Sequence, residues 1–142
     1  MRVLLVCLGN ICRSAAAQGV LQAHAPDWHI ASAGTGGWHV GEPPYPPMQA
    51  AALSRGYDIS AQRAAQVTPA DFMRYDLILA MDAQNLADLR AIRPADATAT
   101  LRQFAHSDVP DPYYTRDFDG CLSMIEAEVP AVINDTSALL SR

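Results

Sequence analysis

Apolar positions along the chain fall into two patterns, short continuous runs and longer stretches with a helical period. The run Val-Leu-Leu-Val ends at a turn that contains glycine, which is typical of a strand buried on both faces of a parallel sheet. Strands are predicted at residues 3–6, 28–33 and 75–80, with a weaker one at residues 100–104. Helices are predicted at residues 14–25, 48–55, 83–92 and 117–140, with a short one that begins within residues 68–71 and precedes the strand at residues 75–80. Strands that alternate with helices predict an α/β layer fold.

Capping and breaking residues support several of these boundaries. Pro47 can open the second predicted helix and Gly56 can close it. Asp82 is a suitable N-cap for the helix that follows it. Pro130 lies inside the last helix, and we expect its missing N–H to kink or divide that helix.

The length and composition are those of an ordinary globular domain. The chain has 142 residues, which fits one domain spanning residues 1–142. Hydrophobic residues make up 50% of the chain and charged residues 18%. The 10 Lys and Arg against 15 Asp and Glu give a net charge of -5, so no basic surplus exists to neutralise a nucleic-acid backbone. We therefore expect no nucleic-acid partner.

The number of cysteines and the N-terminal residues indicate in which cellular compartment the protein is expected. Three cysteines, an odd number, do not form the disulfide framework of a small secreted domain. The apolar run at residues 3–8 is too short to span a bilayer, and no small-residue cleavage site accompanies it. We therefore expect no signal peptide, no membrane partner and a cytoplasmic location.

The first turn has the features of a phosphate-binding loop. Ligands of open α/β sheets bind beyond the carboxyl ends of the strands, where this turn lies. Its amides can surround an anion at the positive end of the next helix, and Gly9 permits close backbone approach. We name this segment the phosphate loop and assign phosphate contacts to Leu8, Gly9, Asn10, Ile11, Cys12, Arg13 and Ser14.

Cys7 and Arg13 flank five intervening residues at this turn. Arg13 offers a planar fork for two phosphate oxygens, and its positive field stabilises Cys7 as a thiolate. A thiolate that faces a bound phosphate predicts in-line attack on phosphorus and a covalent cysteinyl-phosphate.

Such a reaction needs a proton donor for the departing oxygen and then a base for the hydrolytic water. Asp111, between two prolines on a stiff loop, is the candidate for both roles. Asp108 lies in the same loop and is its local competitor.

Five stretches, VCLGNICRS, SAGTGGWHVGEPP, QVTPADF, DLILAMD and DVPDPYY, together resemble the low-molecular-weight protein tyrosine phosphatases across nearly the whole chain. The resemblance implies a three-layer α/β fold with a central four-stranded parallel sheet flanked by helices and the phosphate loop between the first strand and first helix. It implies hydrolysis of phosphotyrosine through Cys7, Arg13 and Asp111, with no metal and no cofactor. The implied partners are phosphotyrosine-containing proteins and, where one accompanies the enzyme, a cognate tyrosine kinase.

The resemblance also assigns supporting roles. Asn10 and Ser14 would brace the phosphate loop in a hydrogen-bond network with Ser32. The substrate-pocket residues would be Ile11 and the aromatic walls Trp38, Tyr113 and Tyr114, which match those that admit a flat phenyl phosphate.

The chain departs from the resemblance in two places. Ala15 and Gln18 stand where Pro and Glu are common, changes that leave the helix favourable. Residues 61–63 lack the histidine that braces the loop in many members, and we expect Gln62 to donate the same hydrogen bond.

Several alternatives stay open at this point. Cys12 is either a loop-filling thiol or a partner that captures Cys7 as a reversible disulfide. An arsenate reductase would need further cysteines, and the only distant one, Cys121, falls on the apolar stripe of the last helix. A phosphoarginine phosphatase typically carries threonine in place of Ile11. A non-catalytic phosphate-binding module would have lost Cys7, Arg13 or Asp111, and none is lost.

Overall fold

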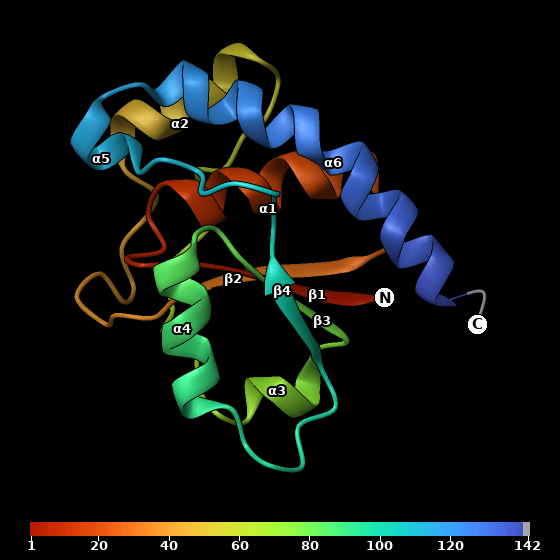
Figure 1. The fold of residues 1–142 in the computed structure, drawn as a ribbon. Coiled ribbons are helices and arrows are strands. Elements are labelled where there is room, and N and C mark those ends of the chain that lie inside the picture. The colour runs from red at the N-terminus through yellow and green to blue at the C-terminus, as the bar shows by residue number, and fades with distance from the viewer. Residues whose placement is uncertain (141–142) are drawn as a thin grey trace.

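A four-stranded, all-parallel sheet forms the centre of the molecule (Figure 1). The computed structural model describes residues 1–140, with the side chains of residues 1–136. The strands lie in the order β2-β1-β3-β4. Their bounds are β1 (Arg2–Cys7), β2 (His29–Gly34), β3 (Leu77–Ala80) and β4 (Thr100–Gln103). The predicted parallel sheet is confirmed, with strand ends shifted by one or two residues from the sequence-based bounds.

Helices cover both faces of the sheet, as Figure 1 shows. Their bounds are α1 (Arg13–His24), α2 (Pro46–Ser54), α3 (Asp71–Arg74), α4 (Ala83–Ile92), α5 (Pro112–Thr115) and α6 (Phe118–Leu140). Val3 and Leu5 of β1 pack in one apolar cluster with residues of α1, α2 and α6. Leu4 and Val6 pack in a second cluster with residues of α3 and α4. The continuous apolar run of β1 is thus buried from both sides, which gives the three layers that the sequence predicts.

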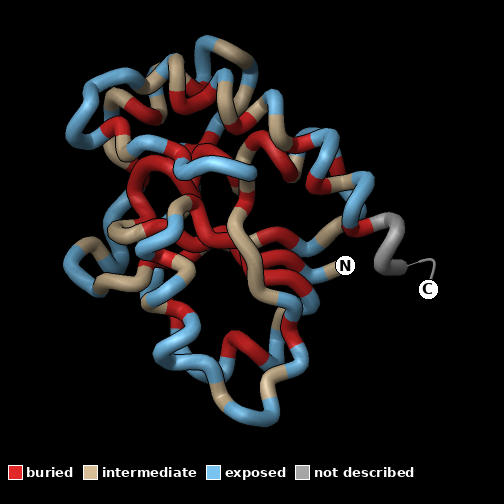
Figure 2. Tube along the Cα trace, viewed as in Figure 1, coloured by how far each residue is buried: buried red, intermediate tan, exposed pale blue. Residues whose placement is uncertain are grey.

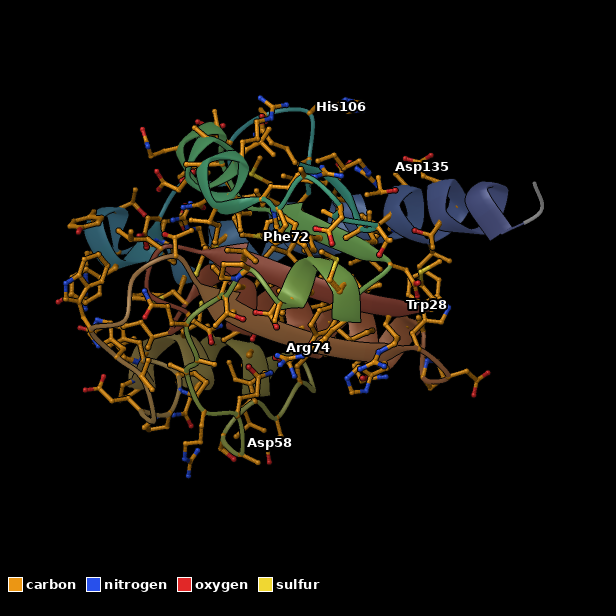
Figure 3. All side chains as sticks on the ribbon, turned by 90° about the horizontal axis from the view of Figure 1, so that it is seen from below. Trp28, Asp58, Phe72, Arg74, His106 and Asp135 are labelled. Carbon is orange, nitrogen blue, oxygen red and sulfur yellow. The ribbon has the colours of Figure 1, made fainter. Side chains whose placement is uncertain are left out.

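The buried residues concentrate in the strands and the inward sides of the helices, whereas the connecting segments are largely exposed (Figure 2). Phe72 of α3, labelled in Figure 3, is fully buried on the α3–α4 face of the sheet. Within residues 1–140, no helix has both the length and the apolar character that crossing a membrane requires.

Pro130 does not divide the last helix, so that part of the prediction is wrong. Helix α6 runs without interruption through 23 residues. Pro130 itself is exposed, whereas its neighbours Val129 and Val132 are buried in the cluster with α1. Packing of the apolar face on both sides of Pro130 therefore compensates for the one hydrogen bond that proline removes.

The topology places a ligand site at one end of β1. The chain moves from β1 to β2 on one side and returns to β3 on the other, so the strand order reverses between β1 and β3. Open α/β sheets bind ligands at such a switch point, beyond the carboxyl ends of the strands. Cys7 ends β1, and Asp82 follows the end of β3 at the same edge.

Candidate active site

The phosphate loop joins the end of β1 to the start of α1 and is fastened to the segment after β2. Thr35 N donates to Cys7 O and Gly36 N donates to Leu8 O, both at 2.9 Å. A Cβ at Gly34 would lie 2.7 Å from Leu8 O, so only glycine allows this approach. No side chain caps α1, and its first turn has no acidic residue. The positive end of α1 is therefore left for a ligand.

The sulfur of Cys7 lies inside this loop and contacts two hydrogen-bond donors. Asn10 N donates to Cys7 Sγ at 3.2 Å, and Ser14 Oγ lies 3.0 Å from Sγ. Asn10 Nδ2 donates to Ser14 Oγ at 2.7 Å, which leaves the Ser14 hydroxyl proton free to point at the sulfur. Donors aimed at the sulfur stabilise negative charge on it, as a nucleophilic thiolate requires.

Asn10 holds the loop in a conformation that few residues adopt. Its φ is 59°, in the left-handed region. Its side chain is buried and fully used: Nδ2 also donates to Ser32 Oγ at 2.9 Å, and Oδ1 accepts from Ala65 N at 3.0 Å. The structure thus brings Asn10, Ser14 and Ser32 into one hydrogen-bond network around the sulfur.

Two glutamines extend this network in ways that the sequence analysis missed. Ser32 Oγ donates to Gln18 Oε1 at 2.6 Å, so Gln18 is more than a favourable helix residue. We expected Gln62 to donate a hydrogen bond to the phosphate loop, and this prediction is wrong. Gln62 Nε2 donates instead to Ala15 O of α1 at 3.1 Å. The backbone N–H of Ala65 bonds to Asn10 Oδ1 instead, because the chain after Gln62 runs along the loop. The segment after Gln62 thus braces the loop through its main chain.

Arg13 is buried at the start of α1, with 4% of its side chain exposed. Its Nη1 donates to Asp82 Oδ2 at 2.6 Å and to Val109 O at 3.0 Å. Nη2 lies 3.5 Å from Asp111 Oδ2. Because both protons of Nη1 are used, the Nε–Nη2 edge is the part of the fork that can bind two phosphate oxygens.

Arg13 remains positively charged although its side chain is buried. Burial by itself lowers the pKa of an arginine, but Cys7, Asp82 and Asp111 favour the cation and together raise the pKa of Arg13 above its ordinary value. Asp82 was predicted only as a helix cap. Its position directly after an apolar strand, at the edge where β1 also ends, is the sequence signal that could have indicated a second role.

The structure distinguishes the two candidate acids. Asp111 caps the short helix α5, where Oδ1 accepts from Tyr113 N at 3.0 Å and Oδ2 is turned toward Arg13. Asp108 Oδ1 accepts from Ala83 N and from Gln103 Nε2, both at 3.0 Å. Asp108 thus joins α4 to β4, and only Asp111 lines the pocket over the loop. Helix α5 was not predicted, although an Asp-Pro pair is a recognised start signal.

A pocket of about 280 Å³ opens over Cys7. Its floor includes Cys7, Cys12 and Arg13, and we call it the loop pocket. The other residues that line it are Leu8, Gly9, Ile11, Trp38, His39, Asp111, Tyr113 and Tyr114. Trp38 and Tyr114 are 70% and 73% exposed, and the rings of Tyr113 and Tyr114 meet edge to face at 5.3 Å. Exposed aromatic faces above a buried anion site suit an aryl phosphate.

Burial keeps the other two cysteines, Cys12 and Cys121, in the neutral thiol form. Burial, with a further contribution from Asp111, raises the pKa of Cys12 well above its ordinary value. Burial likewise raises the pKa of Cys121 to about 12. None of the three cysteines, all of them in the described part of the chain, forms a disulfide. Among the described side chains, no three His, Cys, Asp or Glu residues are grouped so that they could hold a metal ion.

Comparison with known proteins gives a consistent result. Residues 2–139 match the family model of the low molecular weight phosphotyrosine protein phosphatases. A low molecular weight protein-tyrosine-phosphatase of Streptomyces coelicolor is 41% identical, over 89% of this chain and 87% of the relative. Bacillus subtilis YfkJ, of the same description, is 36% identical over 87% and 88%.

Solved structures agree with the sequence relatives. The crystal structure of YfkJ has a TM-score of 0.90 at 32% identity and covers 97% of this chain and 95% of that one. The structure of a protein tyrosine phosphatase from Entamoeba histolytica, with Hepes in its active site, has a TM-score of 0.89 at 30% identity and covers 97% of both chains.

Proposed function

This chain belongs to the low molecular weight phosphotyrosine protein phosphatase family, and we propose that its residues 1–142 form one domain in which Cys7, Arg13 and Asp111 carry out the reaction. It is a protein-tyrosine phosphatase that hydrolyses phosphotyrosine through the cysteinyl-phosphate route general to the family. The observation that supports the assignment of residues is their convergence: Cys7, Arg13 and Asp111 all line the loop pocket.

In the first step the phosphate dianion binds to the amides of the phosphate loop and to the free edge of Arg13. The Cys7 thiolate attacks phosphorus in line and the bond to the tyrosyl oxygen breaks. Asp111, as the carboxylic acid, gives its proton to that oxygen, so tyrosine leaves neutral. The charge that builds on the phosphoryl oxygens is stabilised by Arg13 and the loop amides.

In the second step the cysteinyl-phosphate is hydrolysed. The Asp111 carboxylate, now deprotonated, accepts a proton from water, and the water oxygen attacks phosphorus. The sulfur–phosphorus bond breaks, which releases inorganic phosphate and restores the thiolate. The hydrogen bonds from Asn10 and Ser14 to Cys7 Sγ support the sulfur as a leaving group in this step.

The pocket walls support an aryl ester as substrate. Ile11 lines the pocket with Trp38, Tyr113 and Tyr114, and these side chains offer apolar surface to a phenyl ring. Phosphotyrosine-containing proteins are therefore the substrates that we assign. Because a tyrosine kinase makes such substrates, a cognate kinase is part of the proposal. The net charge of -5 supports the exclusion of nucleic acid and of anionic membrane surfaces as partners.

The thiol chemistry proposed for Cys7 also supports a cytoplasmic location. A nucleophilic thiol must remain reduced, and a cysteine in a positive field is readily oxidised. We therefore assign the enzyme to the cytoplasm, where thiols are kept reduced.

Hydrolysis of an aryl phosphate at mildly acidic pH with EDTA present tests the assignment. The wild type should turn over, and Cys7→Ser should not, while it keeps the wild-type fold and affinity for phosphate. Cys121→Ser, which removes a thiol outside the pocket, should retain turnover. Near-normal turnover by Cys7→Ser would refute the nucleophile. If neither protein turns over, a thioredoxin-coupled arsenate assay tests the reductase alternative.

A further inference from the structure

A second hollow lies beside the loop pocket and shares two wall residues with it. Leu8 and Trp38 line both, so Trp38 stands as the partition between them. This second hollow, which we call the Trp38 groove, has a volume of about 480 Å³. Its far wall is the end of α4, with Asp88 and Ile92. A substrate held in the loop pocket by its phosphotyrosine is thus adjacent to an unused groove.

The partition between the two hollows is set by glycines. A Cβ at Gly36 would lie 1.8 Å from a ring carbon of Trp38, so the indole ring packs directly on the Gly36 backbone. A Cβ at Gly37 would lie 2.7 Å from Gln66 Oε1. Gln66 in turn donates from Nε2 to Thr35 O at 3.2 Å. One face of the Trp38 ring therefore rests on the Gly36 backbone and Gln66 is held to Thr35, so contacts within the chain position this wall of the Trp38 groove.

The groove carries a single charge. Among the described side chains that line it, Asp88 is the only charged one. Asp88 Oδ1 accepts from Gln84 Nε2 at 3.0 Å, whereas Asp88 enters no ion pair among the described side chains. Ile92, 37% exposed, offers apolar surface one turn further along the helix. A free carboxylate beside apolar surface is complementary to a long basic side chain, which lays its methylene stem on apolar atoms and its cation on the acid.

We propose that the Trp38 groove binds a side chain of the protein substrate that flanks the phosphotyrosine, and that Asp88 makes this subsite select lysine or arginine. The inference rests on the proposed function, because the loop pocket must hold the phosphotyrosine. Leu8 and Trp38 line both hollows, so a substrate chain can extend from the loop pocket into the Trp38 groove. The carboxylate of Asp88 is complementary in charge to a lysine or arginine side chain that enters the groove. A small aryl phosphate occupies the loop pocket alone and does not report on the groove.

The other side of the loop pocket provides a contrast. A hollow that shares Ile11, His39 and Tyr113 with it contains one acid, Glu42. His39 Nδ1 lies 2.6 Å from Glu42 Oε2, so that carboxylate already has a partner within the chain. Asp88, on the α4 side, has only the neutral Gln84 amide as a partner and no ion pair among the described side chains, so Asp88 is the acid next to the loop pocket that can select a basic residue.

The test uses phosphotyrosine peptides that carry one lysine, moved from three residues before the phosphotyrosine to three after, with a glutamate series as reference. Each kcat/KM is divided by the same protein's value for a small aryl phosphate. We expect at least one position at which lysine exceeds glutamate by about fivefold at low ionic strength, since exposed ion pairs have effects of this size. The ratio should fall toward unity in Asp88→Asn, which keeps the shape and the bond from Gln84. Asp96→Asn removes the same charge from the loop after α4 and should keep the preference.

Peptide affinity for Cys7→Ser separates this proposal from the proposed function. Because that variant does not need to turn over, its dissociation constants report the lysine preference even if the catalytic assignment fails. A lysine preference that is lost with Asp88→Asn in the Cys7→Ser background supports the subsite. The absence of a preference at every position, or a preference that persists in Asp88→Asn, would overturn it.

Discussion

The guanidinium of Arg13 is bound to the carboxylate of Asp82, with 2.6 Å between Nη1 and Oδ2. The other oxygen of Asp82 accepts from Asn85 N at 2.7 Å and caps α4. One carboxylate therefore fixes Arg13 relative to a helix that belongs to the opposite layer of the fold. Asp82 does not line the loop pocket, so we class it as a positioning residue.

Replacement of Asp82 should reduce activity, because Asp82 orients Arg13. Asp82→Asn keeps the N-cap through Oδ1 but turns Nδ2 toward the buried guanidinium of Arg13, so we expect kcat/KM for an aryl phosphate to fall by about 100-fold and the melting temperature to fall as well. Asp82→Ala should also lose about 1 kcal/mol of stability with the cap. Inhibition by inorganic phosphate, which depends on the same guanidinium edge, should weaken in both. A kcat/KM for Asp82→Asn within twofold of wild type would contradict the role.

Asp111→Asn should lower kcat by about 100-fold to 10,000-fold, the range typical of a lost general acid–base group. Asparagine keeps the cap on α5, so the melting temperature should change little. The alkaline limb of the pH profile of kcat/KM, which reports the proton donor, should flatten. Asp108→Asn is the matched control and should retain activity, because Asp108 bonds to Ala83 and Gln103 outside the loop pocket. An unaltered pH profile in Asp111→Asn would shift the role to Asp108.

Peroxide should convert Cys7 into a disulfide with Cys12. Oxidation gives a sulfenic acid at Cys7, and attack by the Cys12 sulfur forms the disulfide and releases water. Because the pKa of Cys12 is raised by burial, its thiolate fraction grows about tenfold for each unit of pH, and the disulfide should form faster as the pH rises.

Mass spectrometry of peroxide-treated protein, with and without a reductant, measures this disulfide. Activity of the wild type should recover on reduction. Cys12→Ser should instead accumulate the irreversible sulfinic acid at Cys7 and lose activity permanently. If the activity of Cys12→Ser recovers on reduction to the same extent as that of the wild type, Cys12 does not protect Cys7 from irreversible oxidation.

Glu126 should make stability depend on acid pH. Hydrogen bonds from Arg55 and Tyr57 hold the pKa of Glu126 below its ordinary value of 4.5. A folded-state pKa below the unfolded one contributes stability above the unfolded value, and this contribution is lost as the pH falls through the folded one. Glu126→Gln should therefore lower the free energy of unfolding by about 1 kcal/mol at neutral pH and by less in acid.

Urea unfolding across this pH range measures the difference between Glu126→Gln and wild type. Glu128→Gln is the matched control on the same helix, because Glu128 has no ion pair among the described side chains. A difference for Glu126→Gln that stays constant down to acid pH would argue against the ion pair as its cause.

The sequence by itself determined the sheet, the α4 boundaries and the placement of Cys7 and Arg13 on either side of a loop. These features rest on local causes. A continuous apolar run is buried as a central strand, and Asp82 caps the helix that follows it. The sequence could predict that Cys7 and Arg13 act at one site because the two residues are near neighbours in the chain.

Tertiary structure alone decided the contacts between distant residues. Arg13 and Asp82 are 69 positions apart, and Arg13 reaches Val109 across 96. Gln62 bonds to α1 rather than to the loop, and packing of α6 carries that helix through Pro130. No local pattern encodes these outcomes, because each depends on which surfaces meet when the layers pack. The choice between Asp108 and Asp111 belongs to the same class, since only the packed loop decides which carboxylate faces Arg13.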